Sequence, residues 1–404
     1  MDALRLLLVL ALIILGLRLK VPVGITLLAA GGSAALLYGV ALADLGLAYW
    51  HLVQSERFLF LLTVVILITT LGSLLGRLGF LDRLSVACRS LPGGRRLAAG
   101  LMPPLVGLMP MPGGSLLSAP MVGQVLDDPR YPPELKTTTN YWFRHVAEFA
   151  WPVYPGLILT EAMTGLPLGS VALLQLPMTF IMIAVGIVIY IRRIEPEPIA
   201  HPHPIKASRQ IVSAIWPIVL AIVIYAITGI NLNWAVLVAL VALIITARPA
   251  RIHLFGAVKE GISWKLILMV FGVLSFQSAL ELTGAIESIP RLAAGYDLPP
   301  ELVIFMVCFT AGLLTGMVSA FIALGYTILA GYLYDPVVVP GHILLAYVSG
   351  FLGIMLSPAH LCLILTNEYF GSDLGKVYRL LIPASILLAA CGLGLYYSGW
   401  PELF

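Results

Sequence analysis

Long apolar runs are the feature that most limits what this chain can fold into. Runs of roughly 20 residues recur along it, and each could cross a hydrocarbon core about 30 Å thick as a helix. They lie near residues 3–19, 21–40, 58–79, 140–162, 167–191, 211–229, 232–247, 264–283, 343–367 and 379–398. Hydrophobic residues make up 60% of the chain and charged residues only 11%. A water-soluble domain needs more surface charge than this, so the sequence predicts an all-α polytopic membrane protein.

Charge and cysteine placement exclude several classes of function. The formal net charge is +3, with no basic stripe carrying interleaved aromatic residues, so a nucleic-acid partner is not expected. The four cysteines, Cys88, Cys308, Cys362 and Cys391, are scattered and form no C-x-x-C pair. We interpret them as structural thiols rather than a disulfide frame or a metal site. No nucleotide-binding loop is present, so direct use of ATP by this chain is not expected.

Two further apolar stretches are interrupted in the middle. Residues 97–126 contain Met109-Pro110-Met111-Pro112-Gly113-Gly114, where prolines remove hydrogen-bond donors and glycines loosen the backbone. Each limb is then about half a bilayer long, which predicts a re-entrant helical hairpin rather than a crossing. Residues 302–333 have a weaker interruption and are the second hairpin candidate.

The distribution of positive charge supports the first hairpin. Of the 23 Lys and Arg residues we set Arg144 aside, because it lies within a crossing. With both stretches re-entrant, only Arg5, Arg57 and Arg291 fall on one side, and all the others fall on the opposite, cytoplasmic side. If both stretches crossed, this bias would disappear. The N-terminus has no basic n-region or cleavage site, so we expect a retained first helix, with both termini outside a prokaryotic inner membrane.

A weak internal repeat divides the chain into halves. A shift of about 205 residues superposes Gly79 on Gly284, Gly107 on Gly312 and Pro152 on Pro358. The amphipathic stretches 43–57 and 248–262 also correspond, as interfacial helices. We therefore predict two inverted-topology repeats, each with five crossings and one hairpin. Residues 1–191 form the first repeat, residues 192–210 a charged, proline-rich cytoplasmic linker, and residues 211–404 the second repeat.

Helix breaks at corresponding places predict a binding site for a substrate or an ion. The breaks are the two hairpin tips and the interruptions of the crossings 140–162 and 343–367. Unwound backbone within a membrane is tolerated only where protein or a water-filled cavity satisfies its polar groups, and helix N-termini favour anions. The alternative is that the prolines merely kink packed helices. The candidate residues are Pro112, Gly113, Gly114, Ser115, Pro152, Tyr154, Thr315, Gly316, Ser319, Ser357, Pro358 and His360.

Three ionisable residues precede the break at Pro152. Arg144 and Glu148 share a helix face, so they form either an intrahelical ion pair or a site for coupling to Na⁺ or H⁺. His145 and Glu148 make an H-x-x-E pair, but no further ligand lies nearby in sequence, so no metal site is predicted. His360 could line a cavity or simply pack.

The order of hairpin, broken helix and linker, followed by a second hairpin and broken helix, resembles the ion transporter superfamily. That superfamily includes sodium–dicarboxylate symporters, gluconate permeases and the large membrane subunits of TRAP transporters. Within it, residues 107–115 (GLMPMPGGS) and 356–363 (LSPAHLCL) look most like a prokaryotic integral membrane family of unknown function. The resemblance covers nearly the whole chain in layout but only these two motifs in sequence. It implies an elevator mechanism, a carboxylate substrate and a homodimer, as is frequent among relatives.

One departure limits what the resemblance implies. The dicarboxylate symporters carry Ser-Asn-Thr at both hairpin tips, and this chain carries it at neither. Substrate identity and sodium coupling therefore do not carry over. The expected function is secondary active transport of a small organic anion, coupled to Na⁺ or H⁺, with no cofactor and no enzymatic activity. The alternatives are an intramembrane enzyme using His145, Glu148 and His360, or a passive channel.

Overall fold

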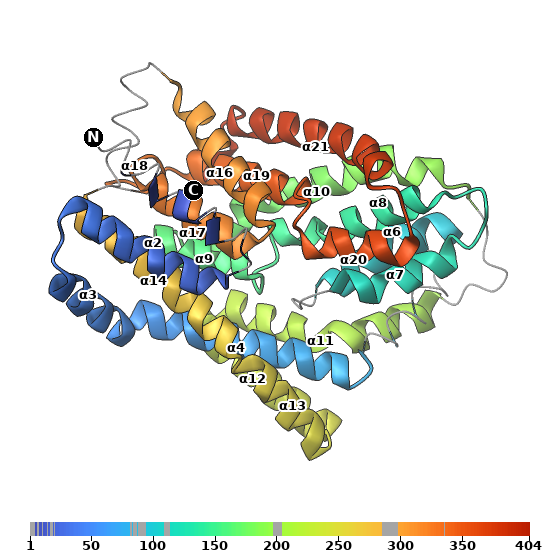
Figure 1. The fold of residues 1–404 in the computed structure, drawn as a ribbon. Helices are drawn as coiled ribbons and strands as arrows, with labels where there is room; N and C mark the ends of the chain where they lie inside the picture. The colour runs from blue at the N-terminus through green and yellow to red at the C-terminus, as the bar shows by residue number, and fades with distance from the viewer. Residues whose placement is uncertain are drawn as a thin grey trace.

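Helices account for every regular element of the described chain (Figure 1). The computed structural model describes residues 21–80, 94–108, 114–196, 204–284, 298–334 and 336–404, several positions between 5 and 19, and residues 83 and 87. Four helices in these ranges are long and apolar enough to cross a membrane: α4 (Glu56–Arg77), α10 (Leu168–Ile189), α11 (Pro204–Thr228) and α21 (Leu374–Tyr396). The prediction of an all-helical protein with membrane-type helices is confirmed at this level.

Seven further helices of the described chain are apolar but shorter. They are α2 (Val23–Tyr38), α12 (Leu232–Ala247), α14 (Trp264–Thr283), α16 (Pro300–Thr315), α17 (Val318–Ile328), α19 (Pro340–Met355) and α20 (Leu361–Phe370). The other helices are α3 (Leu42–Gln54), α6 (Gly94–Gly107), α7 (Gly114–Val125), α8 (Pro133–Arg144), α9 (Pro155–Thr164), α13 (Arg251–Gly261) and α18 (Ala330–Leu333). Short 3₁₀ segments complete the described chain: η1 (Val146–Phe149), η2 (Ile191–Arg193) and η4 (Trp400–Leu403).

Proline and glycine set the ends of several of these helices. Proline occupies the first turn of α8, α9, α16 and α19, where a missing N–H costs no helical hydrogen bond. Glycine in the left-handed conformation ends α9, α16 and α20, at Gly165, Gly316 and Gly371. Helix α11 begins at Pro204, so it takes in the last residues of the segment expected to be a linker.

Two groups of helices can be distinguished in Figure 1. In one group, α14 packs on α2 and α3, α4 packs on α12 and α13, and α11 packs on α12. In the other, α6, α7 and α8 pack on one another, and α20 packs on α7 and α8. In the same group α17 packs on α9, α16 and α19, and α10 packs on α9 and α21. The groups meet where α14 contacts α17 and where α4 contacts α9.

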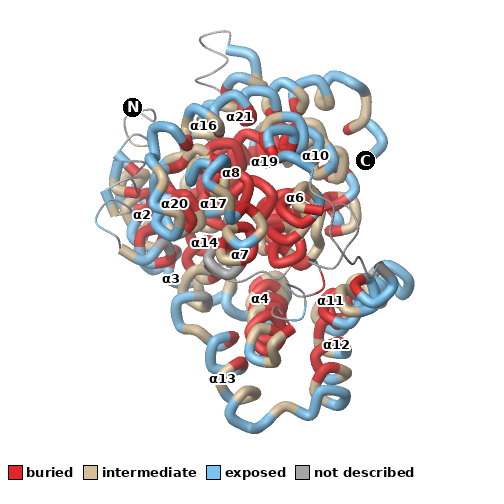
Figure 2. Tube along the Cα trace, turned by 90° about the vertical axis from the view of Figure 1, so that its right-hand side faces the viewer, coloured by how far each residue is buried: buried red, intermediate tan, exposed pale blue. Residues whose placement is uncertain are grey.

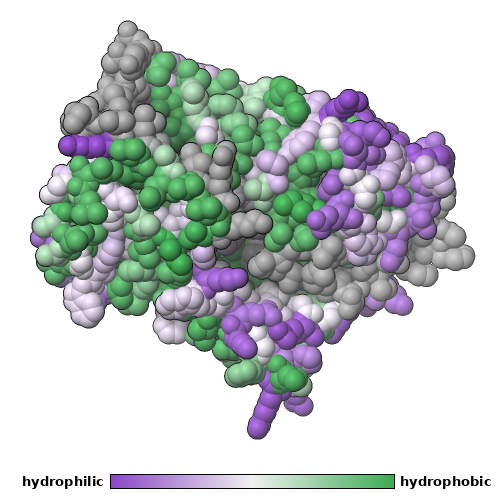
Figure 3. Space-filling model, viewed as in Figure 1, coloured by the Kyte–Doolittle hydropathy of each residue, from purple (hydrophilic) through white to green (hydrophobic). Residues whose placement is uncertain are grey.

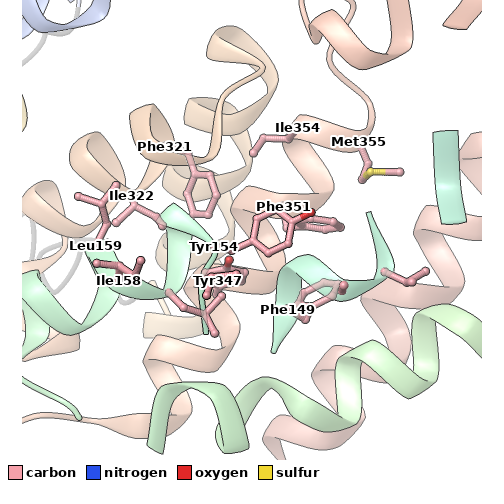
Figure 4. Packing of buried hydrophobic residues seen from close by; sticks show 14 of the residues in the cluster. Phe149, Tyr154, Ile158, Leu159, Phe321, Ile322, Tyr347, Phe351, Ile354 and Met355 are labelled. Carbon is pink, nitrogen blue, oxygen red and sulfur yellow. The ribbon is translucent and has the colours of Figure 1, made fainter. Parts of the chain in front are cut away.

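The interior is formed mainly by the second group. Figure 2 shows buried residues gathered around α8, α17 and α19, whereas α13 is mostly exposed. Aromatic rings fill the space beside η1 (Figure 4): the ring centroids of Phe149 and Phe351 lie 4.4 Å apart, and Phe321 meets Tyr347 edge to face.

Large apolar side chains also cover much of the outer surface. Examples on the long helices are Phe180 and Ile386, which are 62% and 64% exposed. Figure 3 shows apolar residues over much of one face, with hydrophilic residues mainly at its right-hand and lower parts. An exterior of this kind suits contact with lipid rather than water.

Candidate functional site

Four helix ends and four helix starts surround the places where the sequence predicts breaks. Helices α6, α8, α16 and α19 end at Gly107, Arg144, Thr315 and Met355, and α7, α9, α17 and α20 begin at Gly114, Pro155, Val318 and Leu361. Of the predicted residues, Pro112 and Gly113 lie outside the described residues, and Gly114 is the first residue of α7. Pro152 and Pro358 both lie in non-helical segments.

The break in the first half is longer than the sequence predicts. We expect an interruption around Trp151–Gly156, but α8 already ends at Arg144. The His145 Nδ1 atom lies 2.6 Å from the Tyr141 carbonyl, which would otherwise accept the His145 backbone N–H in an α-helix. That N–H bonds to Trp142 instead, and the chain continues as the 3₁₀ segment η1. Glu148 is therefore inside the break rather than one turn before it.

The break in the second half is short and tied to α16. The Ser357 hydroxyl donates to the Leu313 carbonyl at 2.7 Å and accepts from the Ala359 N–H at 3.2 Å. The His360 Nδ1 atom lies 2.7 Å from the Gly316 carbonyl. Gly316 has a φ of +60°, and a Cβ there would lie 2.8 Å from the His360 nitrogen. The two backbones approach so closely that only glycine fits at this point.

A network of neutral polar groups lies beside the two breaks. The Asn140 amide donates to the Ser115 carbonyl at 2.9 Å and to the Thr366 hydroxyl at 3.3 Å, and the Ser115 hydroxyl donates to the Cys362 carbonyl. The Asn140 Oδ1 atom is buried and has no hydrogen-bond partner among the described residues. Asn140 and Thr366 were not among the predicted site residues, although an asparagine in an apolar crossing was a usable signal.

Two predicted hydroxyls point elsewhere. The Thr315 hydroxyl donates to the Ala311 carbonyl of its own helix at 2.8 Å. The Ser319 hydroxyl lies 3.2 Å from the Met269 sulfur on α14, in the other group of helices. Both side chains are buried, but the structure does not bring them into the polar network.

Arg144 and Glu148 form a buried ion pair. Their Nη1 and Oε1 atoms lie 3.5 Å apart, and the side chains are only 3% and 9% exposed. Arg144 also donates to the Tyr154 hydroxyl at 2.8 Å, and that hydroxyl donates to the Gly107 carbonyl at the end of α6. The pair spans the end of α8 rather than one continuous helix. Buried charges are tolerated when they are paired in this way.

His145 meets His360 across the two halves. Their Nε2 atoms lie 3.1 Å apart, and the Cys362 sulfur belongs to the same group of ligand atoms, all within 4.8 Å of one another. The Glu148 Oε1 atom lies 3.9 Å from the His145 Nε2 atom. Because 215 residues separate the two histidines in the sequence, their contact could not be predicted from sequence spacing. Among the described residues, His145, His360 and Cys362 form the group that could hold a metal ion.

Comparison with known proteins places the chain in a family without assigning it a role. No curated protein matches it. The model of a family described as "Protein of unknown function (DUF401)" matches residues 3–397, which is nearly the whole chain. The two broken helices and the polar groups between them lie within this matched range. The chain therefore belongs to the DUF401 family of proteins of unknown function.

Proposed function

We propose that this protein is a secondary active transporter for a small organic anion of the carboxylate type, coupled to Na⁺ or H⁺. The observation that carries the proposal is reciprocal bracing of the two breaks. The Tyr141 hydroxyl donates to the Ile354 carbonyl at 3.4 Å and to the Met355 carbonyl at 3.2 Å, at the end of α19. The Tyr347 hydroxyl donates to the Glu148 carbonyl at 2.9 Å. Each half thus donates a tyrosine hydroxyl to backbone carbonyls at or beside the break of the other half.

This bracing supports an inverted repeat with a shift of about 206 residues. The shift carries Tyr141 onto Tyr347 and Glu148 onto Ile354. The Tyr141–Ile354 hydrogen bond therefore corresponds to the Tyr347–Glu148 hydrogen bond. Helix contacts follow the same exchange: α7 packs on α20 as α17 packs on α9, and α6 packs on α8 as α16 packs on α19. Broken helices related by such a repeat are typical of secondary transporters.

The glycines before the breaks support the same relation. A Cβ at Gly107 would lie 2.5 Å from the Arg144 carbonyl, because the end of α6 packs directly against the end of α8. A Cβ at Gly312 would meet the Gly350 carbonyl of α19. The same shift of about 206 residues relates Arg144 to Gly350, so both close contacts have equivalents in the other half.

Ion pairing near the outer ends of α6 and α7 supports the re-entrant hairpin. Arg95, at the start of α6, lies 3.6 Å from Asp128, which follows α7. Asp128 also pairs with Arg130 at 2.7 Å, and Arg130 pairs with Glu195, which follows η2. Hydrogen bonds from Arg130 lower the pKa of Asp128 to about 2, so these charges persist at neutral pH. A segment whose two ends are tied together at a charged surface enters and leaves on one side.

Helix N-termini and Arg144 support an anionic substrate. Helices α7 and α20 begin beside the breaks and pack on each other, and an N-terminus presents backbone N–H groups and a partial positive charge. Arg144 is a cationic side chain at the first break, and Glu148, which is paired with it, is the candidate for coupling. In the elevator mechanism, the group that contains α6–α10 and α16–α21 would move against the group that contains α2–α4 and α11–α14.

Uptake into proteoliposomes tests this function. We expect a labelled carboxylate from a panel of small acids to accumulate against its gradient when an inward Na⁺ or H⁺ gradient is imposed. Glu148→Gln should remove the dependence on the ion, and Gly114→Val should remove uptake. Gly394→Val is the matched control, because a Cβ at that helical glycine meets nothing within 4 Å. Uptake that is unaffected by any ion gradient and does not saturate would instead favour a passive channel.

A further inference from the structure

We propose that His145, His360 and Cys362 form a binding site for a divalent transition-metal cation of the zinc class. The ligands are two imidazole Nε2 atoms and one thiolate, all within 4.8 Å of one another. His145 follows α8 in the first half, whereas His360 and Cys362 stand at the start of α20 in the second. The site therefore joins the two broken helices where they meet. Among the described residues, no other group of three such side chains has this arrangement.

Hydrogen bonding fixes which nitrogen of each ring is free. The Nδ1 atom of His145 lies 2.6 Å from the Tyr141 carbonyl, and that of His360 lies 2.7 Å from the Gly316 carbonyl. A carbonyl oxygen only accepts hydrogen bonds, so each Nδ1 must carry a proton. In the neutral ring the Nε2 atom is then an acceptor. Two acceptors thus face each other at 3.1 Å, an arrangement that is unfavourable unless a cation lies between them.

The geometry matches what zinc requires. Two Zn–N bonds of about 2.0–2.1 Å meeting at the tetrahedral angle place the nitrogens about 3.3 Å apart. The 3.1 Å separation of the two Nε2 atoms is close to this value. An Nδ1–H bonded to a backbone carbonyl is also the usual outer-shell arrangement of a metal-bound histidine, because it fixes the tautomer and the ring orientation.

Ligand chemistry and charge favour a transition metal over Na⁺ or Mg²⁺. Imidazole and thiolate select zinc and its neighbours, whereas sodium and magnesium prefer oxygen. Binding requires Cys362 to lose its thiol proton, which leaves a thiolate on the metal. The Glu148 carboxylate, which also pairs with Arg144, lies 3.9 Å from the His145 Nε2 atom. Three protein ligands leave one coordination position for a water molecule or another ligand.

The chain provides a matched control for the histidines. His342 makes the same kind of bond, with its Nδ1 atom 2.7 Å from the Tyr332 carbonyl. Its ring stacks on Tyr396, however, and it belongs to no group of three ligands among the described residues. Cys391, an unpaired cysteine on α21, serves the same purpose for Cys362. His342→Gln and Cys391→Ser should therefore leave metal binding unchanged.

The test uses the full-length protein in detergent, stripped with a chelator and then titrated with Zn²⁺ or Co²⁺. We expect one metal per chain, with affinity lowered at least about tenfold in His145→Gln and in His360→Gln. The Co²⁺ protein should show a thiolate-to-cobalt charge-transfer band that Cys362→Ser removes and Cys391→Ser retains. This band remains informative if a histidine variant fails to fold.

Equal metal binding by the wild-type protein and by Cys362→Ser and His360→Gln would overturn the proposal. A proton shared between the two imidazoles would then account for their contact. The readout is metal binding itself, so it does not depend on whether the protein transports an anion.

Discussion

The two breaks meet each other but differ in chemistry. The first, at residues 145–154, is long, contains a 3₁₀ segment and carries the buried pair Arg144–Glu148. The second, at residues 356–360, is short, has no acidic or basic side chain other than His360, and is set against α16 by Gly316 and Ser357. The first break thus holds charged side chains, whereas the second holds a close approach between the Gly316 and His360 backbones. We infer that the first break supplies the charged groups of the proposed substrate site and that the second break determines the shape of that site.

The largest expected effect is loss of charge balance in the first break. Arg144→Gln leaves the Glu148 carboxylate buried without its partner, which should lower the free energy of unfolding by about 3–5 kcal/mol. The double variant Arg144→Gln/Glu148→Gln should recover part of this loss, because no unpaired charge is left. Thermal unfolding in detergent measures both. If the double variant is no more stable than Arg144→Gln, then the unpaired Glu148 charge is not the cause of the loss of stability.

A smaller effect is expected from backbone crowding in the second break. Gly316→Ala places a Cβ in the left-handed region, which costs about 1–2 kcal/mol, and also forces it against the His360 backbone. Gly284→Ala is the matched control, since Gly284 has a similar φ of +63° but open space around it. Gly316→Ala should lower the melting temperature clearly more than Gly284→Ala. Equal shifts would show that the close approach contributes nothing.

The smallest effects should be equal in the two halves. Tyr141→Phe removes a hydroxyl that donates to the Met355 carbonyl at the end of α19, and Tyr347→Phe removes one that donates to the Glu148 carbonyl in the first break. Each should cost about 1 kcal/mol, the typical net contribution of such a hydrogen bond. Melting temperatures of the two variants test this symmetry. A large loss in one variant and none in the other would contradict the reciprocal arrangement.

The all-helical fold and its apolar helices could be predicted from the sequence, because membrane helices leave strong local signals. Proline marked both helix breaks, and the second, at residues 356–360, lies where Pro358 indicated it. The end of α8 at Arg144 could not be predicted, because it depends on the His145 ring bonding to the carbonyl of Tyr141. The turn at Met109–Gly113 lies outside the described residues, so that hairpin tip stays a prediction.

The composition of the site was less accessible, because it arises from contacts between distant segments. From the sequence alone Cys362 is interpreted as a structural thiol, but in the structure it lies beside His145 and His360. Tyr141 and Tyr347 stand at nearly the same shift as the glycines and prolines that indicated the repeat, so a search for matched polar residues could have found them. Contacts between residues in opposite halves of the chain cannot be predicted from the spacing of residues close together in sequence.

A structure of the protein with its transported ligand bound would test the proposed substrate site. We expect a small carboxylate between the start of α7 at Gly114–Ser115 and the end of α16 at Thr315–Gly316, flanked by the breaks at Pro152 and Pro358. Its charge should face the helix N-termini and Arg144. Ligand density found only far from both breaks, in a protein that still transports the ligand, would contradict this placement of the site.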